Sequence, residues 1–153
     1  MSCDFYEFRF NDYYCMKKCD YVSSDTYYRY CRDYSYDECP IYKDEGGSTC
    51  YLSTACVVAM DLSDNCEELN ILRKFRDDYM ATDMKMKNDI CEYYKYAPQI
   101  VKSINLLSDY KEIYKDIYTR LICPCVKYIT KGEYQKAYKL YKSIYFELKN
   151  KYL

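Results

Sequence analysis

Apolar side chains recur at intervals of three and four residues through most of residues 64–153. This spacing places them on one face of an α-helix, and such a face must pack against another element. Gly132 separates the last two of these apolar stripes. The sequence therefore predicts a mainly α fold, a helical bundle built from αα-hairpins. The stripes are Leu69, Leu72, Phe75 and Tyr79; Ile100, Val101, Ile104 and Leu107; Ile113, Ile117, Leu121 and Ile122; and Ala137, Tyr141, Ile144, Tyr145 and Leu148.

Capping and breaking residues predict where these helices begin and end. Asp64 followed by Glu67 has the spacing of a capping box, in which the first residue accepts a backbone hydrogen bond. Asn88 and Ser108 are the expected N-caps of the next two helices. Pro98 should break or kink the helix that contains it, because proline cannot donate the backbone hydrogen bond of a helix interior.

Residues 1–47 differ from the rest of the chain in composition. They are rich in cysteine and tyrosine and show weak periodicity, apart from a short helix expected after Asp25. The stretch DEGGS, residues 44–48, holds two of the three glycines and predicts a joint between two parts. We therefore expect an irregular Cys/Tyr-rich N-terminal segment, residues 1–47, and a helical body, residues 48–153.

The chain contains no histidine. A Cys-His or Ser-His catalytic pair and a histidine-ligated zinc are therefore excluded within this chain. Any general base would have to be a carboxylate, lysine, tyrosine or cysteine. The sequence favours a non-catalytic binding or regulatory module, and it leaves open whether the protein is an enzyme.

Charge and hydropathy bear on partners and compartment. The net charge of −1 gives no electrostatic reason to expect a nucleic acid. No stretch approaches the roughly 20 apolar residues of a membrane helix, and the opening MSCDFYEFRFNDYY is too acidic for a secretory signal. We expect a cytoplasmic protein with reduced cysteines, whose partner is another protein or a second copy of the chain.

Four cysteines of the N-terminal segment are candidate metal ligands: Cys15, Cys19, Cys31 and Cys39. Four thiolates can close a tetrahedral zinc site or hold an iron–sulfur cluster. The segment has few aliphatic residues with which to build a core, so a metal would contribute folding energy directly. Three interpretations of these cysteines are open: a structural zinc, an iron–sulfur cluster, and free thiols packed as small apolar groups under the helices.

Cys50 is the candidate reactive thiol. Ala55 and Ala59 favour a helix over residues 50–60, and Cys50 would then occupy its N-cap, where the helix dipole stabilises a thiolate. The alternative to a binding function is therefore a thiol-based redox or covalent-attachment activity at Cys50. Cys56 lies off the face of Cys50 and is expected in the core.

The stretch RKFRDDY holds a charged cluster of Arg73, Arg76 and Asp77. These side chains are candidates for binding an anion or a peptide. The alternative is a solvated helix face in which Arg73 and Asp77, four residues apart, form a weak ion pair.

The segments CYLSTACV, LNILRKFRDDYM and EYYKYAPQIVKSIN follow one another between about residues 50 and 106. Their ordered combination resembles the CFI-box C-terminal domain found in many bacterial proteins. Tyr51 and Leu52 replace the usual Phe and Ile of that family. The positions that fit are Cys50, Thr54, Ala55, Leu72, Arg73, Phe75, Arg76, Asp77, Tyr93, Tyr94, Pro98 and Ile100.

The resemblance implies a bacterial source and a recurring constellation of Cys50, Arg73, Arg76 and Asp77. This constellation is either a structural lock or a binding site. The family brings no established activity with it, so the resemblance adds no substrate or cofactor to the expectations above.

Overall fold

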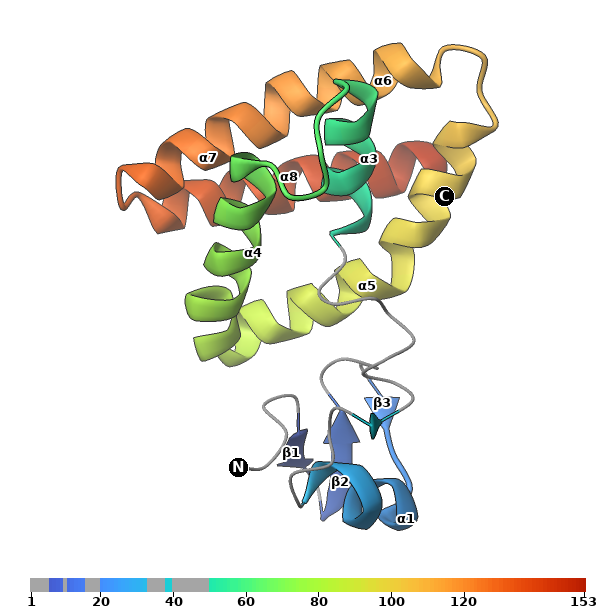
Figure 1. Cartoon of the computed structure of the whole chain (residues 1–153), viewed down its shortest axis with the longest axis vertical. Helices are drawn as coiled ribbons and strands as arrows, with labels where there is room; N and C mark the ends of the chain where they lie inside the picture. Colours follow the sequence, from blue (N-terminus) through green and yellow to red (C-terminus); the bar gives the residue numbers. More distant parts are fainter. Residues whose placement is uncertain (1–5, 10, 16–19, 33–37, 40–49) are drawn as a thin grey trace. The chain divides into compact units, whose positions relative to one another are not determined.

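The computed structural model describes residues 6–9, 11–15, 20–32, 38–39 and 50–153. The chain divides into two compact units, Met1–Thr49 and Cys50–Leu153, which we describe separately. Helices dominate the second unit (Figure 1), so the expected mainly α fold is confirmed. None of the helices in the described ranges has the length and apolar character needed to cross a membrane.

A small antiparallel sheet in the first unit was not anticipated from the sequence. Its strands are β1 (Tyr6–Arg9), β2 (Asp12–Cys15) and β3 (Asp20–Tyr21), in the order β1-β2-β3. Asn11, in the tight turn between β1 and β2, has a φ of 67°, which asparagine tolerates better than most residues. The segment predicted to be irregular therefore contains a paired hairpin.

A short helix follows the sheet, and its start differs from the prediction. α1 (Ser24–Thr26) is capped by Ser23, whose Oγ accepts a hydrogen bond from the Thr26 N–H at 3.2 Å. Asp25 instead lies inside the helix, 3.7 Å from Arg29 in an ion pair. The π-helical turn η1 (Tyr27–Cys31) continues α1.

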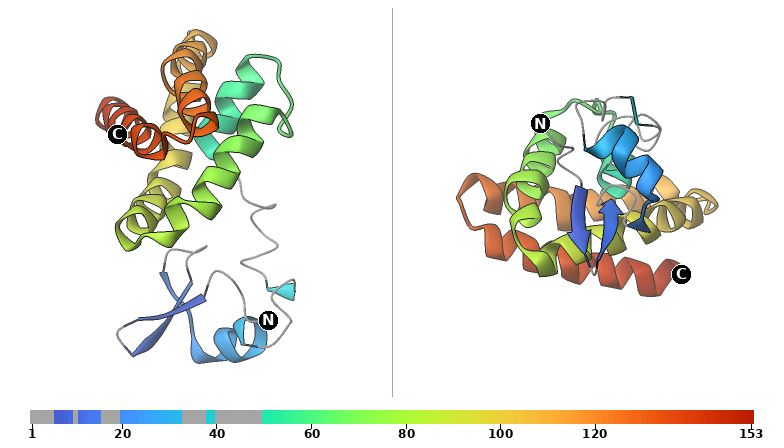
Figure 2. Two further views of the ribbon diagram at one scale, coloured as in Figure 1. Left: turned by 90° about the vertical axis from the view of Figure 1, so that its left-hand side faces the viewer. Right: turned by 90° about the horizontal axis from the view of Figure 1, so that it is seen from below.

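The second unit is a helical body (Figures 1 and 2). α5 packs against α3 and α8, and α4 packs against α7. Gly132, with a φ of 73°, lies in the turn between α7 and α8, so the expected αα-hairpin is confirmed. The elements are α3 (Tyr51–Ala59), α4 (Glu67–Asp78), η3 (Met80–Thr82), α5 (Met84–Asn105), α6 (Tyr110–Ile117), η4 (Tyr118–Ile122), α7 (Cys123–Thr130) and α8 (Tyr134–Tyr152).

The predicted stripes supply most of the core of this body. Leu107 is an exception: it lies beyond the end of α5 at Asn105 and is 40% exposed. Cys56 is fully buried, as expected. The buried stripe residues are Leu69, Leu72, Phe75, Ile100, Ile104, Ile117, Leu121, Ile122, Ala137, Ile144, Tyr145 and Leu148.

Three predicted boundaries are wrong. α4 has Cys66 at its N-cap instead of Asp64, and α5 begins four residues before Asn88. Of the two outcomes expected at Pro98, the break does not occur, because α5 is continuous to Asn105; the helix bends along its length (Figure 1). α6 follows Asp109 instead of Ser108.

α6, η4 and α7 follow one another without a loop. The Cys123 N–H donates to the carbonyl of Tyr118, which makes the intervening turn π-helical. Pro124 follows this π-helical turn directly, in the first turn of α7.

The N-cap of α5 gives a first test of this local structure. Asp83 Oδ1 accepts the Met86 N–H at 2.9 Å, whereas Asp109, at the N-cap of α6, makes no side-chain cap bond. We expect Asp83→Ala to lower the free energy of unfolding in urea by about 1 kcal/mol. The matched control Asp109→Ala should change it by less than about 0.5 kcal/mol. Equal losses in the two variants would show that the cap bond of Asp83 is not the cause.

Candidate functional site

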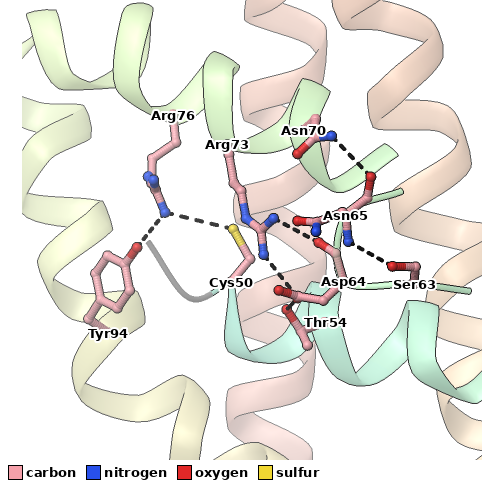
Figure 3. Close-up of polar contacts among 9 residues, drawn as sticks. All are labelled: Cys50, Thr54, Ser63, Asp64, Asn65, Asn70, Arg73, Arg76 and Tyr94. Carbon is pink, nitrogen blue, oxygen red and sulfur yellow. Dashed lines mark hydrogen bonds and ion pairs between the residues drawn. The ribbon is translucent and has the colours of Figure 1, made fainter. Parts of the chain in front are cut away.

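Cys50, Arg73, Arg76 and Tyr94, which we call the Cys50 cluster, come from three helices and meet beside the start of α3 (Figure 3). Cys50 is the N-cap of α3, as predicted, and is only 8% exposed. Arg76 Nη1 donates to Tyr94 Oη at 2.5 Å and lies 3.7 Å from Cys50 Sγ. This one guanidinium therefore connects α3, α4 and α5.

Asp77 pairs with its neighbour in sequence. Arg76 Nε and Nη2 donate to the two carboxylate oxygens of Asp77 at 2.7 and 2.9 Å. The Asp77 side chain is 51% exposed, whereas that of Arg76 is 14% exposed. The carboxylate thus lies on the solvent side of the guanidinium.

The expected ion pair between Arg73 and Asp77 is replaced by one between Arg73 and Asp64. Arg73 donates from Nη1 to the Asp64 carbonyl at 2.8 Å and from Nη2 to Asp64 Oδ1 at 2.9 Å. Thr54 Oγ1 donates to the same carboxylate oxygen at 3.1 Å. Asp64 therefore joins α3 to α4 instead of capping α4, and Arg73 Nε is buried without a hydrogen-bond partner among the described residues.

The electrostatics of Cys50 differ from those expected at a helix N-cap. Burial raises the pKa of the Cys50 thiol, and the nearby charges of Arg76 and Arg73 only partly offset it. Tyr93 Oη, and not the sulfur, accepts the Leu52 N–H at the first turn of α3, at 2.9 Å. In the folded protein Cys50 is therefore a protonated thiol at neutral pH.

A cavity of about 40 Å³ adjoins the Cys50 cluster. Its wall is apolar, with Leu72, Phe75, Met80 and Ile90 among the lining side chains. Cys50, Arg76 and Tyr94 also line it, as do Cys125 of α7 and Tyr141 of α8. This cavity could not be predicted from the sequence, because residues from α3 to α8 converge on it only in the folded body.

Differential alkylation tests the state of Cys50. Cys123 is exposed, whereas Cys50 is buried and its pKa is raised. We expect iodoacetamide to label Cys50 at least about tenfold more slowly than Cys123 in the native protein. Mass spectrometry of labelled peptides measures both rates, and in urea they should converge. Faster labelling of Cys50 than of Cys123 would mean that the two arginines outweigh burial.

The predicted metal ligands of the N-terminal segment are only partly described. Cys15, Cys31 and Cys39 are buried, and Cys19 lies outside the described residues. Within the described ranges, no group of three or more cysteine or carboxylate side chains converges as a metal site would require. A structural zinc or an iron–sulfur cluster in this segment stays a prediction, and elemental analysis of the purified protein would test it.

Comparisons with known proteins identify no relative of this chain. No protein-family model, curated protein or solved structure matches the chain, so the similarity to the CFI-box domain remains a resemblance of the quoted segments.

Proposed function

We propose that the helical body is a non-catalytic binding module, and that its cavity takes a small, mainly apolar group. The cavity itself is the observation that carries this proposal. Protein interiors are close-packed and hold few voids larger than a water molecule. At about 40 Å³ this one has room for about three water-sized groups. Its largely apolar wall favours a hydrocarbon occupant over water.

The contacts of the Cys50 cluster support binding over catalysis. Arg73 and Arg76 each form a two-point interaction with an aspartate residue, which fixes their positions. The pKa of the Cys50 thiol is raised by burial, so little nucleophilic thiolate is present at neutral pH. A rigid polar rim above an apolar pocket is the usual form of a small-molecule binding site.

A titration with n-butanol, followed by NMR of ¹³C-labelled methionine methyl groups, tests the proposal. Met80 lines the cavity and is 4% exposed, whereas Met84, on the next helix, is 56% exposed. We expect a saturable shift of the Met80 methyl signal and only a small linear drift of the Met84 signal. A Met80 signal that drifts with no saturation would overturn the proposal.

A variant in which a larger side chain fills the cavity is the control for this titration. Leu72 lines the cavity and is 8% exposed, and Leu72→Phe places a larger side chain there. We expect this variant to keep its helical circular dichroism and to lose the saturable shift of the Met80 signal. Saturation that persists in a folded Leu72→Phe protein would mean that butanol binds elsewhere.

The second candidate function is a thiol activity of Cys50. It is favoured by the two guanidinium groups beside the sulfur, since cations stabilise a thiolate. The alkylation experiment above separates the two functions, because only an activated thiol would react faster than Cys123.

A further inference from the structure

Two cysteines away from the cavity lie where the start of α4 meets η4 and α7. Cys66 is the N-cap of α4 and is half-buried, whereas Cys123 is the first residue of α7 and is exposed. α4 packs directly against α7. The two thiols therefore belong to neighbouring helices, although they are far apart in the sequence.

One carboxylate and one phenol connect these two thiols. Tyr118 Oη donates to Glu68 Oε1 at 3.2 Å in a partly buried contact. The Cys66 thiol donates to the same carboxylate, and Tyr118 also hydrogen-bonds the Cys123 thiol. Each thiol thus lies within one hydrogen bond of the pair formed by Glu68 and Tyr118.

The π-helical turn η4 determines where the Cys123 side chain points. The Cys123 N–H donates to the carbonyl of Tyr118, five residues earlier, whereas an α-helix pairs residues four apart. The wider turn brings the Cys123 side chain toward that of Tyr118, and a regular α-helix would rotate it away. Single π-helical turns of this kind occur frequently at functional sites.

We infer that Cys66 and Cys123 form a redox pair, which hydrogen peroxide converts into a disulfide that joins α4 to α7. Cys123, the exposed thiol, reacts first: its sulfur takes one oxygen atom from peroxide to give a sulfenic acid, and one water leaves. The Cys66 sulfur then attacks the sulfenic sulfur. The S–S bond forms, the S–OH bond breaks, and the hydroxide leaves with the Cys66 proton as a second water. The two thiols lose two electrons, which the peroxide gains.

The surroundings of the two thiols assign these roles. Burial raises the pKa of the Cys66 thiol, and its hydrogen bond to Glu68 raises it further, so Cys66 itself reacts slowly with peroxide. The backbone N–H of Glu68, the Cys66 thiol and the Tyr118 hydroxyl lower the pKa of the Glu68 carboxyl. The ionised carboxylate is therefore in place to take the Cys66 proton when that sulfur attacks the sulfenic acid.

Peroxide treatment of the native protein, followed by alkylation of the remaining thiols and peptide mass spectrometry, tests the inference. We expect a Cys66–Cys123 linked peptide, lighter by two hydrogen atoms than its two parts, that disappears with dithiothreitol. Cys91, which is also half-buried, should stay open to alkylation. Disulfides from Cys66 or Cys123 to other cysteines would overturn the inference. So would a sulfinic acid at Cys123 with Cys66 still free.

Serine variants test the order of the two steps. In Cys66→Ser, we expect Cys123 to stop at the sulfenic acid, which dimedone traps as a stable thioether. In Cys123→Ser, we expect dimedone to label Cys66 at least about tenfold more slowly, because this thiol is half-buried and its pKa is raised. Equal labelling rates would contradict the assigned order.

Urea unfolding tests whether the bridge forms within the native packing. A cross-link between residues 66 and 123 restricts the unfolded chain, so the peroxide-treated protein should unfold at a higher urea concentration than the reduced protein. Cys66→Ser, treated in the same way, is the control and should show no such rise. An equal rise in both proteins, or none in the wild type, would contradict a bridge between the packed helices.

Discussion

Raising the pH above about 10 should unfold the helical body over a narrow pH interval. Burial raises the pKa of several thiols and phenols in the core, that of Cys125 to about 12. In the unfolded chain these groups ionise near their ordinary values, about 8.5 for cysteine and 10 for tyrosine. The other buried or half-buried groups with a raised pKa are Cys50, Cys56, Tyr93, Tyr94, Tyr114, Tyr141 and Tyr145.

Proton linkage determines whether stability rises or falls with pH. Because each folded-state pKa is raised, the unfolded chain loses its protons first as the pH rises. The stability from these groups is complete below about pH 8.5 and is then lost at up to about 1.4 kcal/mol per group and pH unit. Summed over several groups, this loss exceeds a typical free energy of unfolding of about 5–15 kcal/mol within one or two pH units.

Circular dichroism and tyrosinate absorbance, followed together against pH, measure this transition. We expect a large part of the phenol ionisation to coincide with the loss of helix. Tyr145→Phe, which removes one of the raised phenols, should make the loss of stability with pH shallower. Tyr134→Phe, at a residue that is 39% exposed, should not. Ionisation of every tyrosine near pH 10 in a protein that stays helical would contradict the buried phenol network.

Truncation of a buried side chain at the end of α5 should be strongly destabilising. Ile104 is fully buried, and Ile104→Ala should lower the free energy of unfolding by about 2–5 kcal/mol, from lost burial and the space left behind. Leu106, two residues on, is 81% exposed. Leu106→Ala should change stability by less than about 0.5 kcal/mol. Similar urea midpoints for the two variants would contradict the orientation of α5.

The helices of the body could be predicted from the sequence because burial imposes a period that survives in the residue pattern. Ile117 and Leu148 are buried for this reason. The N-caps were less predictable, since several short polar residues before each stripe satisfy the same preference. In the N-terminal segment, β1 and β2 carry tyrosines such as Tyr13 and Tyr14, whose amphipathic side chains hide the alternation typical of a strand.

The site was only half predictable. Cys50, Arg73 and Arg76 were singled out and lie together. The partner of Arg73 was missed because the helical spacing rule considers only neighbours on the same helix, and Asp64 lies on the preceding loop. The N-cap position of Cys50 predicts a lowered pKa, whereas the pKa is raised in the folded protein. Burial by residues distant in sequence is the cause, and a local sequence pattern does not reveal it. The cavity depends on Tyr141, which only the packing of α8 brings to the cluster.

Xenon binding is the most direct test of the claim that the body holds a ligand-sized apolar cavity. Xenon occupies dry apolar cavities without hydrogen bonds, so its position reports the cavity alone. Crystals held under xenon pressure should show an anomalous peak between Leu72, Met80 and Ile90 that is absent from Leu72→Phe crystals. Wild-type crystals with this fold and no xenon at that position would contradict the claim.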